Sequence, residues 1–312
     1  MEGKIGAEEL LKFYLAGKTS FRNADLSGVS LERANLQGID LQGAYLRWAT
    51  LQGANLREAN LSWADLQRAN LSDAILQKAN LKEASLRKAK LQWADFQEAQ
   101  LQSAKMEKCD LTCANLRAAS LRLVSLQGAN LDKANMLMVD LRVATLTEAK
   151  LLDANLEMAK LQEANLSKTN LMGANLAKAL ANGASFQEAR LFGANLSDAN
   201  LTGVNLAGAD LQEAKLFGTN LSGANLTEAR LPSLQNMQGA KLLGAQLKGV
   251  RLPRGESLQQ AMQPDGVIPD RRSPRALEPV MTTAELLPEK AVPEMPPQEE
   301  SAANRRGLTL YS

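Results

Sequence analysis

The apolar residues of this chain recur every five positions, a spacing that fits neither a helix nor a strand. In LREANLSWADLQRANLSDAILQKANL, residues 56–81, Leu stands at every fifth position and Ala two positions before almost every Leu. On a helix, residues five apart lie about 140° around the axis, so no face would collect the leucines. On a strand they would alternate between the two faces, because five is odd. The backbone must therefore turn once per repeat, which lets each Leu and Ala point to a common interior.

The pattern persists through most of the chain. There are 43 centre positions from Phe21 to Leu231, and 37 of them hold Leu. Two residues before the centre, 34 of 42 positions hold Ala, and the rest hold Val, Ile, Thr or Cys. The residue just before the centre is Asn or Asp in 24 of 42 repeats, and we expect it to face outward, where its side chain can support a turn. Repetition on this scale predicts a solenoid lined by Leu and Ala, and the spacing alone leaves three or four sides per coil open.

At this point the repeats resemble a known family. Many repeats resemble the A(D/N)LXX signature of the pentapeptide-repeat family, in which two variable residues follow Leu, as in Ala54-Asn55-Leu56, 64–66 (Ala-Asp-Leu) and 194–196 (Ala-Asn-Leu). The resemblance covers about three quarters of the chain. It implies an all-β fold, a right-handed quadrilateral parallel β-helix with four repeats per coil. Residues 9–17 also resemble the segment that precedes the repeats in members from photosynthetic bacteria.

Departures from the repeat divide the chain into three parts. Residues 1–20 contain a short helix over 7–16 that ends at Gly17. We expect this helix to cap the open end of the interior. Residues 21–252 form the β-helix, with a one-residue slip after Leu231 that Pro232 suggests is a bulge. Residues 253–312 hold nine of the ten prolines and are predicted to be a disordered tail.

The residues that catalysis or metal binding would require are scarce. The chain has no His, and of its two cysteines Cys109 takes an interior position while Cys113 takes an outward one, so we expect no metal site and no cofactor. Without a histidine base, an activated nucleophile or a glycine-rich phosphate loop, we predict that the protein is not an enzyme. No secretion signal or membrane-spanning run is visible, which favours the cytoplasm.

The outward side chains carry two candidate binding features if a coil has four sides. The first is an apolar column spaced by twenty residues, Leu152, Met172 and Phe192, widened on the next side by Leu137, Met138, Met158 and Phe217. Exposed apolar patches of this kind mark contacts with other proteins, with another copy of the chain or with a tail that folds back, although scattered apolar substitutions on a stable rod are an equally good explanation. The second is a basic strip beside Trp48, made of Arg47, Arg68, Arg87, Lys88, Lys105 and Lys108. Asp65 and Glu107 interrupt the strip, which favours a solvated face over a nucleic-acid site.

The predicted function is a non-enzymatic scaffold, a rigid rod that displays a protein-binding surface. The expected partner is an unidentified protein or a second copy of the chain. The family resemblance implies an alternative, because some members imitate B-form DNA and bind DNA gyrase. That mimicry needs a strongly negative surface, whereas residues 21–252 carry 26 basic and 22 acidic side chains. Residues 271–275 and 308–311 of the tail are further candidate partner motifs.

Overall fold

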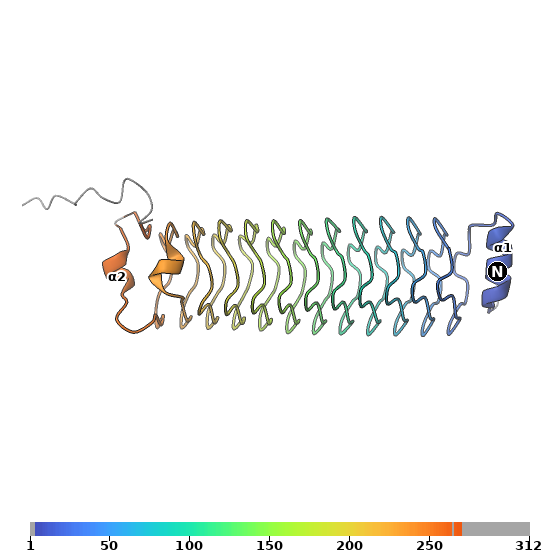
Figure 1. The fold of residues 1–312 in the computed structure, drawn as a ribbon, viewed down its shortest axis with the longest axis horizontal. Coiled ribbons are helices and arrows are strands. Elements are labelled where there is room, and N and C mark those ends of the chain that lie inside the picture. The colour runs from blue at the N-terminus through green and yellow to red at the C-terminus, as the bar shows by residue number, and fades with distance from the viewer. Residues whose placement is uncertain (1–3, 264, 270–312) are drawn as a thin grey trace, which may run out of the picture.

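In the computed structural model the repeats form one straight rod with a helix across each end (Figure 1). The structure describes residues 4–263 and 265–269. Its helical elements are α1 (Ala7–Leu15), the 3-10 helix η1 (Leu234–Met237) and α2 (Leu258–Ala261). Between α1 and η1 the backbone repeats a turn and a single bridging residue every five positions. The coil therefore consists of isolated bridges rather than extended strands.

Each coil has four sides, because bridging residues pair in parallel with partners twenty positions away. Asn55, for example, bridges both Asn35 and Ile75. Its N–H donates to the carbonyl of Ala34 in the preceding coil at 2.9 Å, and the N–H of Leu56 donates to Ile75 in the next coil at 2.8 Å. This ladder settles the number of sides that the spacing left open.

The interior is lined by the centre residues and the small residues two before them, as the pattern predicts. Leu56, Ala54 and their equivalents along the coil have almost no exposed surface. Thr169 and Thr219 replace interior alanines, and their hydroxyls donate to the carbonyls of Leu166 and Leu196 at 2.6 and 2.8 Å. Full burial of a Leu is favourable by about 1.5–3 kcal/mol, so the buried column stabilises the coil along its whole length.

The outward Asn and Asp residues support the turns through local hydrogen bonds, as predicted. The Oδ1 atom of Asp25 accepts from the N–H of Ser27 at 3.0 Å, and that of Asn55 accepts from Arg57 at 3.2 Å. The N–H of the next small residue donates back to the centre carbonyl, as from Ala59 to Leu56 at 3.0 Å. These two bonds close each corner and aim the next side of the coil.

Helix α1 covers the N-terminal end of the interior. Leu10 is fully buried against the first coil, and the hydroxyl of Tyr14 donates to the carbonyl of Gln37 at 2.7 Å. Ile5, ahead of the helix, donates its N–H to Asp25 at 2.9 Å and continues the ladder. The predicted capping helix is therefore present in this part of the chain.

The register slip near the C-terminal end is also present, and a helical turn absorbs it. Bridges lengthen from twenty to twenty-one residues, as between Asn220 and Lys241. The extra residue lies in the loop that contains η1, just after Pro232. Met237 then returns to a fully buried centre position. The predicted bulge is thus a short 3-10 helix, because a turn can add a residue without moving the sides that follow.

The predicted tail begins too early, because part of it forms a cap. Leu258 of α2 and Ile268 are only 8% and 3% exposed at the C-terminal end. Residue Val267 bridges Lys241 in the antiparallel sense, and the N–H of Ile268 donates to Ala240 at 3.0 Å. The last coil would otherwise expose its apolar interior, so a few apolar residues after position 253 suffice to cover it. Residues 270–312, including the candidate motifs at 271–275 and 308–311, lie outside the described residues.

Candidate protein-binding surface

The apolar column forms one continuous row on the outside of the coil. Leu152, Met172 and Phe192 each take the first outward position of a turn, in three successive coils. The N–H of Asp153 donates to the carbonyl of Met172, and that of Gly173 to Phe192, both at 3.0 Å. Leu152 and Met172 are half-buried and Phe192 is 42% exposed. The coil therefore holds these three side chains in a rigid stack.

The other apolar residues lie at the far edge of the neighbouring side. Met138 and Met158 are 47% and 46% exposed at successive turns, whereas Leu137 and Phe217 are half-buried. The N–H of Met158 donates to Ala177 at 2.9 Å. Side chains at the first turn position lie on the same side of the coil as the bridging residues. The bridging residue Arg190 shows this, because its guanidinium donates to the sulfur of Met172, a first turn residue, at 3.0 Å. Met172 and Phe217 therefore belong to adjacent sides rather than to one.

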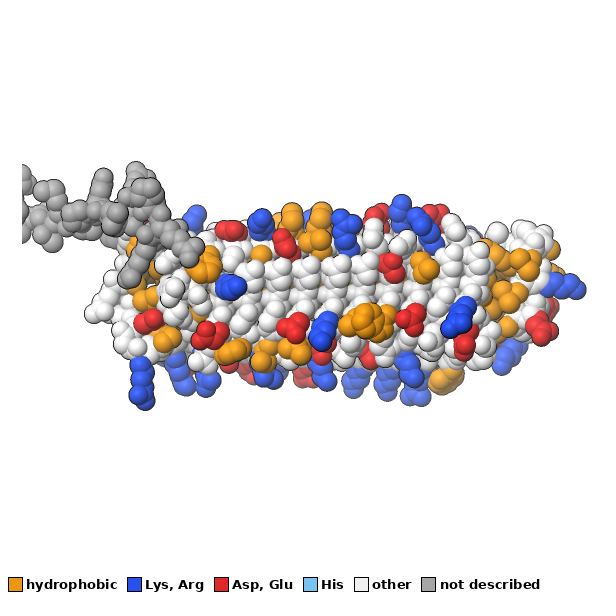
Figure 2. Space-filling model, viewed as in Figure 1, with side chains coloured by type: hydrophobic (Ala, Val, Ile, Leu, Met, Phe, Trp, Pro, Cys, Tyr) orange, Lys and Arg blue, Asp and Glu red, His pale blue; other side chains and the backbone are white. Residues whose placement is uncertain are grey.

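A flat polar strip separates these two apolar edges. It is a ladder of Asn side chains in which Asn175 donates to Asn155 at 3.3 Å and Asn195 donates to Asn175 at 3.1 Å. Gly173 and Gly193 occupy the corner between this ladder and the apolar column. Figure 2 shows that one face of the rod carries a smooth white band of uncharged polar side chains and backbone, with hydrophobic groups along its edges. The five-residue pattern does not reveal this ladder, although an Asn repeated at twenty-residue intervals is its signal.

The basic strip is present on one side, but ion pairs neutralise part of it. Arg47 pairs with Asp65 at 2.6 Å and Arg87 with Glu107 at 2.9 Å. The guanidinium of Arg68 lies 6.0 Å from the ring of Trp48. Its remaining members, Lys88, Lys105 and Lys108, are exposed. The strip therefore presents less free positive charge than its composition indicates.

The pKa of Glu107 shows how firmly one of these pairs is held. Burial would raise this pKa, but hydrogen bonds from Arg87 and its positive charge hold it below the ordinary value. The same pair raises the pKa of Arg87, first through the hydrogen bond and then through the charge of Glu107. A lowered carboxyl pKa means that Glu107 stays ionised at pH values where an ordinary carboxyl is already protonated, so the pair is lost only as the pH falls through that lowered pKa.

Comparison with known proteins decides the family. The family model described as pentapeptide repeats matches in overlapping copies between residues 17 and 231. The chain belongs to the pentapeptide-repeat family. A search of the curated proteins gave no match.

Solved structures of pentapeptide-repeat proteins resemble this one to different degrees. HetL from the cyanobacterium Nostoc sp. strain PCC 7120, involved in heterocyst differentiation regulation, is 31% identical, with 85% of this chain and 99% of that chain covered and a TM-score of 0.56. The protein alr5209 of Nostoc PCC 7120 is 36% identical over 35% of this chain and 84% of that one, with a TM-score of 0.20. QnrB1, a plasmid-mediated fluoroquinolone resistance protein, is 18% identical over 75% of this chain and 94% of that one, with a TM-score of 0.30. HetL thus supports the pentapeptide-repeat solenoid as the fold of this chain.

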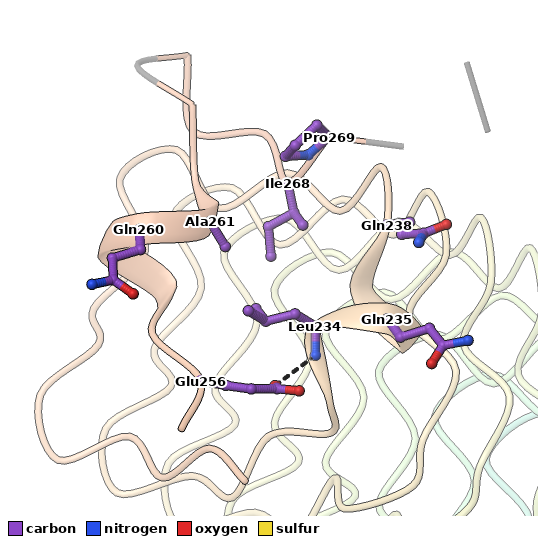
Figure 3. A pocket seen from close by; sticks show the side chains of 8 residues that line it. All are labelled: Leu234, Gln235, Gln238, Glu256, Gln260, Ala261, Ile268 and Pro269. Carbon is purple, nitrogen blue, oxygen red and sulfur yellow. Dashed lines mark hydrogen bonds between the residues drawn. The ribbon is translucent and has the colours of Figure 1, made fainter. Parts of the chain in front are cut away.

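A hollow in the described part of this pentapeptide-repeat protein lies between η1 and α2 (Figure 3). It has a volume of about 700 Å³ and is lined by Leu234, Gln235, Gln238, Glu256, Gln260, Ala261, Ile268 and Pro269. The carboxylate of Glu256 accepts the N–H of Leu234 at 2.8 Å, which joins the C-terminal cap to the last coil. A carboxylate used in this way holds the cap in place, and the glutamines beside it are weak candidates for catalysis.

Metal and thiol chemistry find little support in the described part of this pentapeptide-repeat protein. Residues 4–263 and 265–269 contain no group of three or more His, Cys, Asp or Glu side chains that could hold a metal ion. Burial raises the pKa of the Cys109 thiol, which lies in the interior, while Cys113 is half-buried at a turn. Over the same ranges no helix is long and apolar enough to cross a membrane.

Proposed function

We propose that this pentapeptide-repeat protein is a non-enzymatic interaction rod, and that Leu152, Met172 and Phe192 form the centre of its binding surface. The stack of these three side chains in consecutive coils is the observation that carries the proposal. A rigid scaffold loses little conformational entropy on binding, and a fixed apolar row is the kind of surface that partners bury. Met138, Met158 and Phe217 extend the surface around the polar strip.

Two further observations support binding rather than catalysis. The exterior of the coil offers carboxylates that are engaged in turns, as Asp25 and Asp40 are. Their hydrogen bonds lower the pKa values of these groups, whereas a carboxyl that acts as a general acid needs a raised one. The involvement of HetL in regulation also favours a role in which one protein binds another.

The test replaces Met172 and Phe192 with Lys in the full chain. The doubly substituted protein should lose the proteins that the natural sequence captures from native lysate, because two ammonium groups would be desolvated in the contact. The matched control replaces Leu123 and Val143, which are exposed on another corner, with Lys. This control variant should still capture the same proteins as the natural sequence. Quantitative mass spectrometry reads the captured proteins, and circular dichroism checks that both variants are folded. If the variant with Lys at positions 172 and 192 captured the same proteins as the natural sequence, the apolar column would not be the binding surface.

A further inference from the structure

Three pairs of outward residues around the polar strip lie symmetrically about one level of the rod. In the apolar column, Leu152 and Phe192 lie one coil to either side of Met172. At the far edge of the Asn ladder, Leu137 and Phe217 lie two coils to either side of Ala177. Met172 and Ala177 are consecutive first turn positions, so both rows share the same midpoint.

Charge follows the same symmetry at the corner between these rows. Gly173 occupies the middle of that corner, and two coils away on either side lie Lys133 and Glu213, which are exposed and have opposite charges. A surface in which matching sizes and opposite charges lie equally far from one centre is complementary to itself when it is turned by 180°.

We propose that the partner for this surface is a second copy of the chain, bound antiparallel and side by side about a two-fold axis at the level of Ala177. This identification of the partner rests on the proposed function of the apolar column. Leu137 of each copy then packs against Phe217 of the other on the side that carries the Asn ladder, and Leu152 of each copy faces Phe192 of the other at the edge of the adjacent side. Lys133 of each copy faces Glu213 of the other.

The polar strip suits the same arrangement. Asn175 lies next to the axis and faces its own copy, while Asn155 faces Asn195. Each amide has donors and an acceptor, so one Asn can bond another of the same kind. Lys178 also faces its own copy, but it is exposed at the outer corner, from which a long side chain can carry its ammonium group into water.

A parallel arrangement of the two rods fits less well. Residues at the same level would then meet across the strip, so that Leu152 would face Glu157 and Phe192 would face Ser197. The apolar rows would be paired with polar side chains, and the corner charges would no longer meet. The antiparallel pairing therefore sets Leu137 against Phe217 and Leu152 against Phe192, while at the outer corner it places Met158 opposite Asp198.

The size of the contact sets its strength. With a rise of about 4.8 Å per coil, the five coils from Lys133 to Phe217 span roughly 20–25 Å along the rod. A side of the coil is of the order of 10 Å wide, so the contact is well below the ~800 Å² per partner of a standard interface. We therefore expect a dimer that forms reversibly and depends on concentration.

Charge exchange provides the first test, measured by sedimentation of the full chain over a range of concentrations. Lys133→Glu and Glu213→Lys should each weaken the dimer roughly tenfold, because each places like charges together twice per dimer. The double variant should restore the natural dissociation constant to within about threefold, since the pair is merely reversed. The matched control is Lys108→Glu, at the same turn position on another corner, which should leave association unchanged.

Cross-linking tests the position of the axis. In a Cys113→Ser background, Ala177→Cys should form a disulfide-linked dimer under mild oxidation, because residue 177 meets its own copy. Ala207→Cys, at the equivalent half-buried turn position of another side, should stay monomeric. Failure of the 177 cross-link together with failure of the charge reversal would overturn the dimer. If the chain is monomeric throughout but Met172→Lys with Phe192→Lys still abolishes capture of other proteins, the dimer is wrong and the interaction rod stands.

Discussion

At the scale of single residues, the corner of each repeat is the most demanding position. The second outward residue of all 42 turns from Asn23 to Glu228 has a positive φ, and 30 of these residues are not Gly. Left-handed backbone costs an ordinary residue roughly 1–2 kcal/mol. The hydrogen bonds that close each corner and the burial of the centre residue must offset this cost. The repeat pattern predicts where the turns lie but not their conformation, because Lys, Glu and Trp at these positions give no sign of a positive φ.

Val143 is the clearest case of such strain, because its side chain is β-branched and its φ is 59°. It is 42% exposed, so its apolar contacts are limited. Replacing it with Gly should raise stability by about 0.5–1 kcal/mol, the relief of strain exceeding the extra freedom of Gly in the unfolded chain. The urea midpoint of unfolding measures the change. Val139→Gly, at a fully buried position, should instead lower the midpoint, and a fall for both variants would contradict the argument.

At the scale of elements, the ends of the coil show how far composition can mislead. The N-terminal helix could be predicted, since five large apolar residues within positions 7–16, followed by Gly17, signal a short amphipathic cap. The C-terminal cap could not, because its apolar residues are few and lie among prolines. Leu258 and Ile268 are buried only because the last coil leaves its interior open. Their role depends on the neighbouring coil, which local composition does not report.

The C-terminal cap depends on the close approach of Gly266 to the last coil. A Cβ atom at this position would lie 2.8 Å from the nitrogen of Leu243 and 2.9 Å from its Cα. Gly266→Ala should therefore push residues 266–268 away from the coil and break the hydrogen bonds from Leu242 to Gly266 and from Gly239 to Ile268. Faster amide hydrogen exchange at Leu242 and Gly239 measures this opening.

Gly255→Ala is the matched control for the cap. Gly255 also has a positive φ, 83° against 78° for Gly266, but a Cβ there would meet no atom within 4 Å. The two substitutions share the conformational cost and differ in the clash. Equal exchange rates in both variants would show that the packing of Gly266 on Leu243 does not hold the cap.

At the scale of the whole molecule, the fold could be predicted more completely than the binding surface. Leu at 37 of 43 centres dictates a turning coil, because no other backbone can bury leucines five apart. The outer positions obey no such constraint, so their pattern does not reveal which of them bind a partner. The sequence placed Leu152, Met172 and Phe192 in one column, but the Asn ladder and the neutralised arginines emerged only from the hydrogen bonds and ion pairs of the coil.

The charge of the whole rod bears on the DNA-mimic alternative. A rod that replaces DNA in a topoisomerase groove must be strongly negative, because the groove attracts phosphates. Residues 21–252 carry a net charge of +4, and surface pairs such as Arg47 with Asp65 leave no continuous row of carboxylates on the sides they occupy. At stoichiometric concentration the purified chain should therefore neither inhibit DNA supercoiling by gyrase nor protect the enzyme from a fluoroquinolone. A reaction without the protein is the negative control, and a reaction with a DNA-mimicking inhibitor is the positive control. Inhibition or protection at that concentration would mean that the shape of the rod matters more than its charge for binding to gyrase. The binding surface would then be the rod as a whole rather than the apolar column.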